Sequence, residues 1–220
     1  MSMSLPILYS LQNCPYAMRA RLGLLLAQQP VMLRAVVMKN KPTEMLAVSP
    51  KATVPVLVLD DGTVIDESLD IMIWALHQSD PLNLLHSEDP EAYSAMLALI
   101  NIHDTVFTSA LSKYKYAVRY HEDNEAELRN QCADYVTMLE LRLSQHAYLM
   151  GENASLADYA ILPLIRQFAR VDRQWYLQAP LPHLRNWLNQ HLQDQRFAKA
   201  MAKYPQWLEN KEAFLFGHAD

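Results

Sequence analysis

The sequence predicts an α+β protein in which a small domain of strands and helices precedes a larger domain built from helices alone. In the first third of the chain, short apolar runs bounded by turn residues alternate with helical segments, in the order β-α-β-α-β-β-α. Beyond a break rich in Asp and Pro, apolar residues recur only at steps of three and four. We expect domains at 1–78 and 89–220, joined by a linker at 79–88.

The first expected strand and helix meet at a cysteine. Pro6–Tyr9 is a short apolar run typical of a buried strand, and Arg19–Gln28 carries leucines at helical spacing. Between them, Cys14 precedes Pro15, and proline fits the first position of a helix because its missing N–H would have no partner there. The pattern therefore predicts a thiol at the start of a helix.

The remaining elements of this domain follow from turns and breaks. Gln28–Pro30 is a turn before an apolar run, Lys39–Pro42 is a polar break, and Asp60–Gly62 is typical of a hairpin turn. The expected elements are a strand at Val31–Val37, a short helix at Thr43–Val48, strands at Pro55–Leu59 and Thr63–Ile65, and a helix at Leu69–Leu76.

The second domain shows several apolar helical stripes. One runs from Ala92 to Tyr114 and a second from Leu128 to Leu143, with later helical segments near 155–171 and 184–192. Cys132 lies on the second stripe, where we interpret it as a small core residue rather than a resolving or regulatory thiol. His103 lies on the first stripe and is interpreted as a core residue rather than a base.

Composition excludes several classes of function. The 220 residues carry a net charge of -5 without a run of Lys or Arg, so neither nucleic acid nor a membrane surface is an expected partner. Two cysteines make no disulfide framework, and no apolar stretch is long enough to span a bilayer, so a cytoplasmic location is expected. Four scattered glycines exclude nucleotide-binding glycine motifs, and the eight histidines form no motif for a metal site, so no metal is expected.

The chemistry expected of the chain centres on Cys14. Unpaired N–H groups and the positive end of the helix dipole both favour thiolate over thiol at a helix start. A dithiol oxidoreductase would carry a second cysteine three residues later, but Ala17 occupies that position. A mixed disulfide on Cys14 would therefore need another thiol to release it. The alternative is that Cys14 is only a small buried apolar group.

These residues resemble a known family. The first domain is similar to a thioredoxin-fold domain, and the whole chain resembles a cytosolic glutathione transferase. The motif Cys14-Pro15-Tyr16-Ala17 is most similar to the omega-type, cysteine-dependent branch and to two-domain glutaredoxins. The resemblance implies glutathione as cosubstrate, Cys14 as the catalytic residue and a possible homodimer.

The resemblance also implies a glutathione site around Cys14. Val54 and Pro55 match a cis X-Pro bond whose exposed backbone pairs with the cysteinyl part of glutathione. Glu67 matches a residue that takes the γ-glutamyl ammonium, and Ser68 matches one that binds the carboxylate at a helix start. The alternative for the acidic residues and Ser68 is a plain helix cap.

Further site residues are implied on the loop after the second strand. Lys41 matches a lysine that meets the glycyl carboxylate, with Lys39 as the second choice, and both could instead be solvated surface lysines. Tyr16 and Met38 are expected to line the site.

In the helical domain, the resemblance implies a buried capping motif and a proline within the helix that follows it. Ser155 and Asp158 match the motif, and Pro163 is expected to bend the helix. Tyr114, Tyr116 and Tyr120 are expected either to form an aromatic wall for the substrate or to pack between domains.

Taken together, we expect a glutathione-dependent thiol transferase that forms a mixed disulfide through Cys14. Two alternatives are conjugation of glutathione to small electrophiles and a non-catalytic, transferase-like binding protein. Conjugating relatives use a tyrosine or serine hydroxyl near the N-terminus. Tyr9 and Ser10 are present, but Cys14 holds the position expected of the nucleophile.

Overall fold

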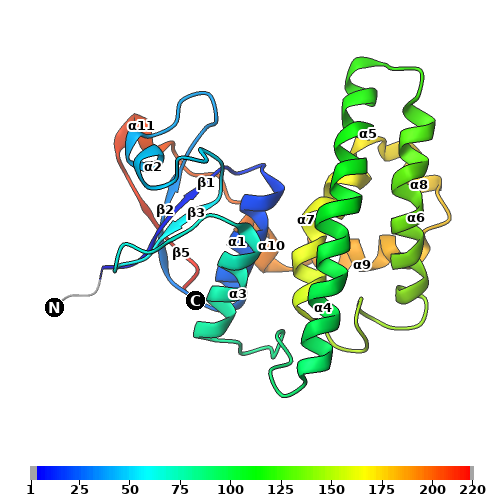
Figure 1. The fold of residues 1–220 in the computed structure, drawn as a ribbon, viewed down its shortest axis with the longest axis horizontal. Helices are drawn as coiled ribbons and strands as arrows, with labels where there is room; N and C mark the ends of the chain where they lie inside the picture. The colour runs from blue at the N-terminus through cyan, green and yellow to red at the C-terminus, as the bar shows by residue number, and fades with distance from the viewer. Residues whose placement is uncertain (1–3, 219–220) are drawn as a thin grey trace. The chain divides into compact units, whose positions relative to one another are not determined.

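The computed structural model describes residues 4–218, which divide into two compact units (Figure 1). One unit joins the chain up to Leu82 with the chain from Asp194 onward, and we call it the sheet unit. The other spans Asn83–Gln193, and we call it the helical unit.

The sheet unit contains a mixed sheet with the strand order β4-β3-β1-β2-β5. Strands β1 and β2 are parallel, and the remaining neighbours are antiparallel. The strands are β1 (Ile7–Ser10), β2 (Val31–Ala35), β3 (Val56–Val58), β4 (Val64–Ile65) and β5 (Phe214–Phe216). The helices are α1 (Pro15–Leu26), α2 (Thr43–Val48), α3 (Ser68–Gln78), α10 (Gln195–Ala200) and α11 (Trp207–Asn210).

The expected order β-α-β-α-β-β-α is confirmed in this unit. Helix α1 begins at Pro15, the first helical position expected for this proline, and the helical residues expected from Arg19 onward continue the same helix. Helix α2 has the expected bounds, Thr43–Val48.

Strand β5 was missed by the sequence prediction, which assigned 89–220 to helices alone. Phe214–Phe216 pairs with β2, where Val31 lies opposite Phe216 and Leu33 opposite Phe214. Three residues are too few to show a strand period, so only the tertiary partner identifies this strand. Residues from Asp194 onward therefore belong with the sheet, which moves the boundary of the expected helical domain.

Helices α1 and α3 approach closely at one glycine. A Cβ atom built on Gly23 would lie 2.7 Å from the Cα of Met72, closer than real Cβ contacts. Only glycine leaves room for the α3 backbone here. This close contact sets the distance at which α1 packs against α3.

The helical unit is an antiparallel packing of long helices around an apolar core. Its helices are α4 (Pro90–Ile102), α5 (Thr108–Tyr120), α6 (Glu125–Leu143), α7 (Leu156–Val171), α8 (Arg173–Gln178) and α9 (Pro182–Gln193). Asp89 caps α4 by accepting bonds from the backbone N–H groups of Glu91 and Ala92, at 3.1 and 3.0 Å. Residues Leu99, Ile100, Leu111, Val136 and Leu139 are buried, as the periodicity predicts.

A short π-helical segment, η1 (His103–Phe107), joins α4 to α5. His103 is fully buried, its Nδ1 lies 3.1 Å from the Tyr135 hydroxyl, and its ring stacks on Phe107 with centroids 5.0 Å apart. The interpretation of His103 as a core residue is confirmed by this burial.

The capping motif before α7 is present as expected. Asp158 accepts from the backbone N–H and the hydroxyl of Ser155, at 2.9 and 2.8 Å. It also accepts from the Leu149 N–H and the Trp187 indole N–H, both at 2.9 Å. The carboxylate therefore links three parts of the helical unit. Pro163 lies inside α7, and the bend expected there stays a prediction.

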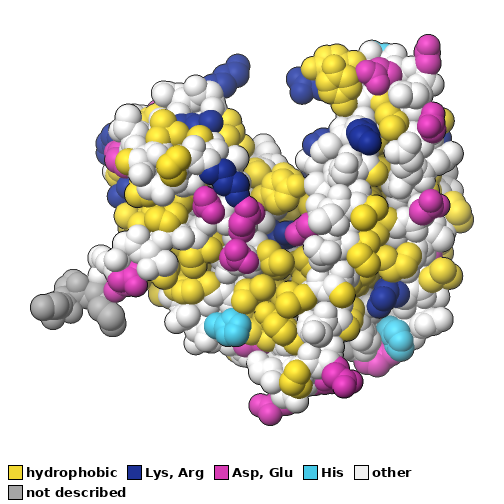
Figure 2. Space-filling model, in the orientation of Figure 1, with side chains coloured by type: hydrophobic (Ala, Val, Ile, Leu, Met, Phe, Trp, Pro, Cys, Tyr) yellow, Lys and Arg dark blue, Asp and Glu magenta, His cyan; other side chains and the backbone are white. Residues whose placement is uncertain are grey.

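The three tyrosines of α5 do not share one environment. Tyr114 is buried near Phe168, whereas Tyr116 and Tyr120 are exposed, with ring centroids 4.3 Å apart. Figure 2 shows hydrophobic groups beside basic ones at the C-terminal end of α5, where the helix ends at Tyr120. An aromatic wall that includes Tyr114 is therefore wrong, because its ring belongs to the core.

Candidate active site

Cys14 occupies the N-cap position of α1. Its backbone is extended, with φ −74° and ψ 123°, and Pro15 begins the helix directly after it. The Cys14 carbonyl accepts the first helical bond from the Met18 N–H at 2.9 Å, and the side chain is half-buried. The side chain makes no capping hydrogen bond to the N–H groups of the first turn, but it lies at the end of the helix that carries the positive end of the dipole.

The Cys14 thiol lies against the loop before β3. Its Sγ donates to the carbonyl oxygen of Val54 over 3.9 Å, and the Val54–Pro55 peptide is cis, as predicted. Cys14 packs beside a buried cluster that includes Tyr9, Val54 and Val56. The structure thus brings together two of the sequence-predicted site positions that are 40 residues apart in the chain.

Among its described residues, the sheet unit holds no cysteine besides Cys14. Ala17, one helical turn later, is fully buried. The other cysteine, Cys132, is fully buried in α6 of the helical unit, and burial raises the pKa of its thiol to about 12. These features support the interpretation of Cys132 as core packing.

Helix α3 begins beside the predicted acidic and serine residues. Glu67 is the N-cap residue and makes no side-chain capping bond, so the plain helix cap is not observed for it. Ser68 is buried, and its hydroxyl oxygen accepts from the Arg19 guanidinium at 3.5 Å. Asp66 accepts from the Ser49 hydroxyl at 3.0 Å. Since the first N–H groups of α3 have no side-chain cap, they can bind an external acceptor.

Lys51, which the sequence analysis did not single out, lies beside Glu67 in the structure. It forms an ion pair with the exposed carboxylate of Glu67, and the hydrogen bond to Glu67 raises the pKa of the lysine. Lys51 lies three positions before Val54, in the same loop. No residue pattern links it to Glu67, because the loop and the start of α3 meet only in the folded chain.

The other residues predicted to bind glutathione lie after β2 and in the first turn of α1. Met38 and Lys41 follow β2 in the connection to α2, where Met38 is exposed and Lys41 half-buried. Lys39 is exposed in the same connection, and Tyr16 is exposed in the first turn of α1. Their part in ligand binding stays a prediction.

The described residues provide neither a cluster of metal ligands nor a helix that could span a membrane. Among residues 4–218, no group of three or more His, Cys, Asp or Glu side chains is arranged to hold a metal ion. Within the same range, no helix combines the length and apolar character needed to cross a bilayer.

Comparison with protein families gives two matches in chain order. Residues 8–82 match the glutathione S-transferase N-terminal domain, and residues 122–190 match the glutathione S-transferase C-terminal domain. A rice protein named probable glutathione S-transferase DHAR2, chloroplastic, is 22% identical over 84% of this chain. The alignment spans 59% of that curated relative.

Solved structures share the fold. A glutathione transferase family member from Pseudomonas fluorescens, solved with two glutathione molecules bound, has a TM-score of 0.79 and 19% identity, over 90% of this chain and 92% of that one. The transferase URE2P6 from Phanerochaete chrysosporium, in complex with oxidized glutathione, has a TM-score of 0.75 and 18% identity, over 90% and 94% of the two chains. With its thioredoxin-like sheet unit followed by a helical unit and both family domains in order, the chain belongs to the cytosolic glutathione transferase family.

Proposed function

We propose that this transferase is a glutathione-dependent thiol transferase that uses Cys14 as its nucleophile. The observation that carries the proposal is the half-buried thiol at the N-cap of α1, with Ala17 in the place of a resolving cysteine. A sulfur nucleophile without an internal partner suits exchange with an external thiol. Among family branches, this arrangement favours the omega-type and the two-domain glutaredoxins.

The proposed reaction has two exchange steps. The Cys14 thiolate attacks the glutathionyl sulfur of a mixed disulfide, the old S–S bond breaks, and the departing thiolate takes a proton from solvent. A second glutathione thiolate then attacks the glutathionyl sulfur on Cys14. Oxidised glutathione leaves and the Cys14 thiolate returns. One disulfide is reduced and one is formed, so the electrons balance without a metal or a nucleotide.

Glutathione would be held by backbone and side chains around Cys14. The Val54 backbone lies next to Cys14 Sγ and can pair with the cysteinyl part of the tripeptide. The uncapped start of α3 can bind the γ-glutamyl carboxylate through Ser68, and Glu67 can take the ammonium. Lys41 would meet the glycyl carboxylate, with Tyr16 and Met38 beside it.

Lys51 adds a feature to this binding scheme. Because Lys51 pairs with Glu67, the glutathione ammonium must share or replace that ion pair. An exposed ion pair contributes only about 0–1 kcal/mol, so a ligand ammonium can displace it at small energetic cost.

The decisive experiment compares Cys14→Ser with wild type. With glutathione and a glutathionylated peptide, we expect wild type to release the free thiol and Cys14→Ser to lose that activity. Intact mass spectrometry of wild type treated with oxidised glutathione should show one glutathione adduct, and this adduct should be absent in Cys14→Ser.

Cys132→Ala is the matched control, because it removes the other cysteine of the chain. It should keep both the adduct and the turnover. Equal disulfide reduction by wild type and Cys14→Ser would disprove the mechanism. A chloronitrobenzene acceptor tests the conjugating alternative: conjugation that survives in Cys14→Ser, together with absent disulfide reduction, would favour that class instead.

A further inference from the structure

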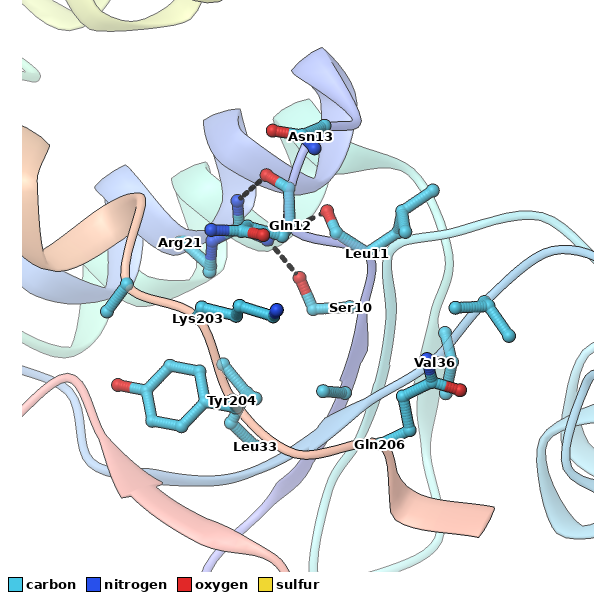
Figure 3. Close-up of a pocket in the computed structure, with 13 residues that line it drawn as sticks. Ser10, Leu11, Gln12, Asn13, Arg21, Leu33, Val36, Lys203, Tyr204 and Gln206 are labelled. Carbon is cyan, nitrogen blue, oxygen red and sulfur yellow. Dashed lines mark hydrogen bonds between the residues drawn. The ribbon is translucent and has the colours of Figure 1, made fainter. Parts of the chain in front are cut away.

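A cavity of about 230 Å³ lies in the sheet unit beyond the ends of β1 and β2 (Figure 3). Its walls come from the loop after β1, from the end of β2 and from the segment that follows α10. Cys14 is not among the residues that line it, although its chain neighbour Asn13 is, and Cys14 lies close enough to Arg21 to act on the pKa of that guanidinium.

Arg21 of α1 supplies a buried positive charge to this cavity. Its guanidinium donates to the Ser10 hydroxyl, to the carbonyls of Leu11 and Gln12 at 3.1 and 2.6 Å, and to the carbonyl of Ala200 at 2.6 Å. All four acceptors are neutral. Arg21 is only 2% exposed, and burial lowers its pKa to about 10. A guanidinium has five N–H donors, so these bonds leave one Nη2 hydrogen for another acceptor.

Lys203, an exposed residue of the segment after α10, supplies a second cation at the mouth of the cavity. In Figure 3 its amine points toward Ser10, on the same side as the Arg21 guanidinium. In the part of the chain that the structure describes, Lys203 makes no ion pair, and the 13 residues that line the cavity contain no Asp or Glu. Two cations thus face one cavity without a carboxylate to balance them, which favours an anionic ligand.

Part of the cavity lining is apolar. Leu33, Val36 and Val37 supply apolar lining, and Figure 3 shows Leu33 beside Tyr204 and Val36 beside Gln206. Sites for drug-sized ligands have volumes of about 300–1,000 Å³, so this cavity suits a smaller molecule. Apolar area next to cations suits an acid with a short hydrocarbon body better than it suits a fully hydrated inorganic anion.

We propose that this cavity is a binding site for a small organic monocarboxylate. The carboxylate binds between Arg21 and Lys203, and its apolar body packs against Leu33 and Val36. The site does not depend on the proposed thiol chemistry, because neither cation is part of the Cys14 mechanism.

The test uses the full chain and benzoate as the probe, with benzamide as its neutral isostere, at constant ionic strength. Binding is followed by two-dimensional NMR of the amides and by calorimetry. We expect benzoate to bind and to shift the resonances of Leu33, Val36 and Lys203, whereas benzamide does not bind. Inorganic phosphate, which has charge but no apolar body, should bind more weakly than benzoate.

Variants locate the site without removing Arg21, whose loss could unfold the unit. Lys203→Gln should weaken benzoate binding about tenfold, because it removes one of the two charges that hold the carboxylate. Lys199→Gln makes the same charge change on α10, outside the lining residues, and should bind like wild type. Ala202→Phe should fill the cavity and abolish binding while both cations remain.

The outcomes separate this proposal from the proposed function. Cys14→Ser should bind benzoate like wild type, since the nucleophile does not line the cavity. Equal binding of benzoate and benzamide, phosphate binding as tight as benzoate, or equal effects of Lys203→Gln and Lys199→Gln would each overturn the proposal. No benzoate binding at millimolar concentration would overturn it as well.

Discussion

The Nε of Arg21 in α1 donates to the carbonyl oxygen of Ala200, at 2.6 Å, across 179 positions of the chain. The same guanidinium bonds the backbone of Leu11 and Gln12, and the Gln12 side chain donates to the Met201 carbonyl at 2.8 Å. Arg21 therefore joins the end of α10 to the loop that leads into Cys14. The Leu11 carbonyl also accepts from the Cys14 N–H at 3.3 Å, and Arg21 adds a buried donor to it and to the carbonyls of Gln12 and Ala200.

Replacing Arg21 tests this role. In Arg21→Met, buried carbonyls lose their donor, so we expect the free energy of unfolding to fall by about 3 kcal/mol. Urea unfolding followed by circular dichroism measures the change. Arg173→Met, at an exposed position at the start of α8, is the control and should change stability by no more than about 0.5 kcal/mol. Equal stability of the two variants would contradict the role of Arg21.

Gly23→Ala should destabilise the protein. Inside a helix, this exchange normally stabilises by about 1 kcal/mol. Here the new Cβ would lie 2.7 Å from the Met72 Cα, so α1 and α3 must move apart, and we expect a net loss of about 1–3 kcal/mol. Thermal unfolding gives the sign directly. A second change, Met72→Ala, should restore stability only in part, because the Met72 backbone remains in the way.

Local patterns predicted much of the sheet unit. The helix start at Cys14-Pro15 and the helix Thr43–Val48 depend on caps and breaks within a few residues, and both are present. The capping motif at Ser155 and Asp158 is likewise local and was found where expected. Helix caps and helix starts can be predicted from a few neighbouring residues, because they do not depend on what the segment contacts in the folded protein.

The features that the sequence did not predict depend on distant partners. Strand β5 is recognisable only by its pairing with β2, and the Lys51–Glu67 ion pair joins a loop to a helix 16 positions away. The cavity beside Arg21 requires the segment after α10 to return to the sheet. None of these contacts leaves a period or a motif in the chain, because each depends on the tertiary fold.

Asp158→Asn should weaken the helical unit. The carboxylate accepts four bonds, from Ser155, Leu149 and Trp187, whereas an amide has one oxygen and would place an NH₂ group against other donors. We expect a loss of about 2–4 kcal/mol and a changed Trp187 fluorescence. Ser155→Thr keeps the hydroxyl and should retain most of the stability. A stability of Asp158→Asn equal to wild type would show that the carboxylate is not needed.

Glu67→Gln tests the proposed glutathione site. The loss of the carboxylate removes the partner of the γ-glutamyl ammonium, so we expect KM for glutathione to rise about tenfold while kcat changes little. Asp60→Asn is the matched control in the nearby hairpin, and its KM should be unchanged. Stability should be unaffected in both, because Glu67 is exposed. An unchanged KM in Glu67→Gln would remove this residue from the site.

The burial of Cys132 predicts a specific alkaline pH dependence. Its thiol pKa is raised from an ordinary value of 9.0 to about 12 by burial, so between these values the unfolded chain loses a proton that the folded chain keeps. The group therefore contributes stability that is fully present below pH 9.0 and is lost as the pH rises towards about 12.

Cys132→Ala removes this titration and reveals it by difference. At about pH 8 the substitution should lower the free energy of unfolding by about 1 kcal/mol, as a small loss of core packing does. At about pH 10.5 the gap between wild type and variant should close or reverse, because ionisation of the Cys132 thiol stabilises only the unfolded chain of wild type. Val136→Ala, fully buried on the same helix and without a titrating group, should show a gap that does not change with pH. Urea unfolding of the three proteins at both pH values measures the gaps, and a Cys132→Ala gap that stays constant between them would show that the thiol ionises equally in the folded and unfolded chain.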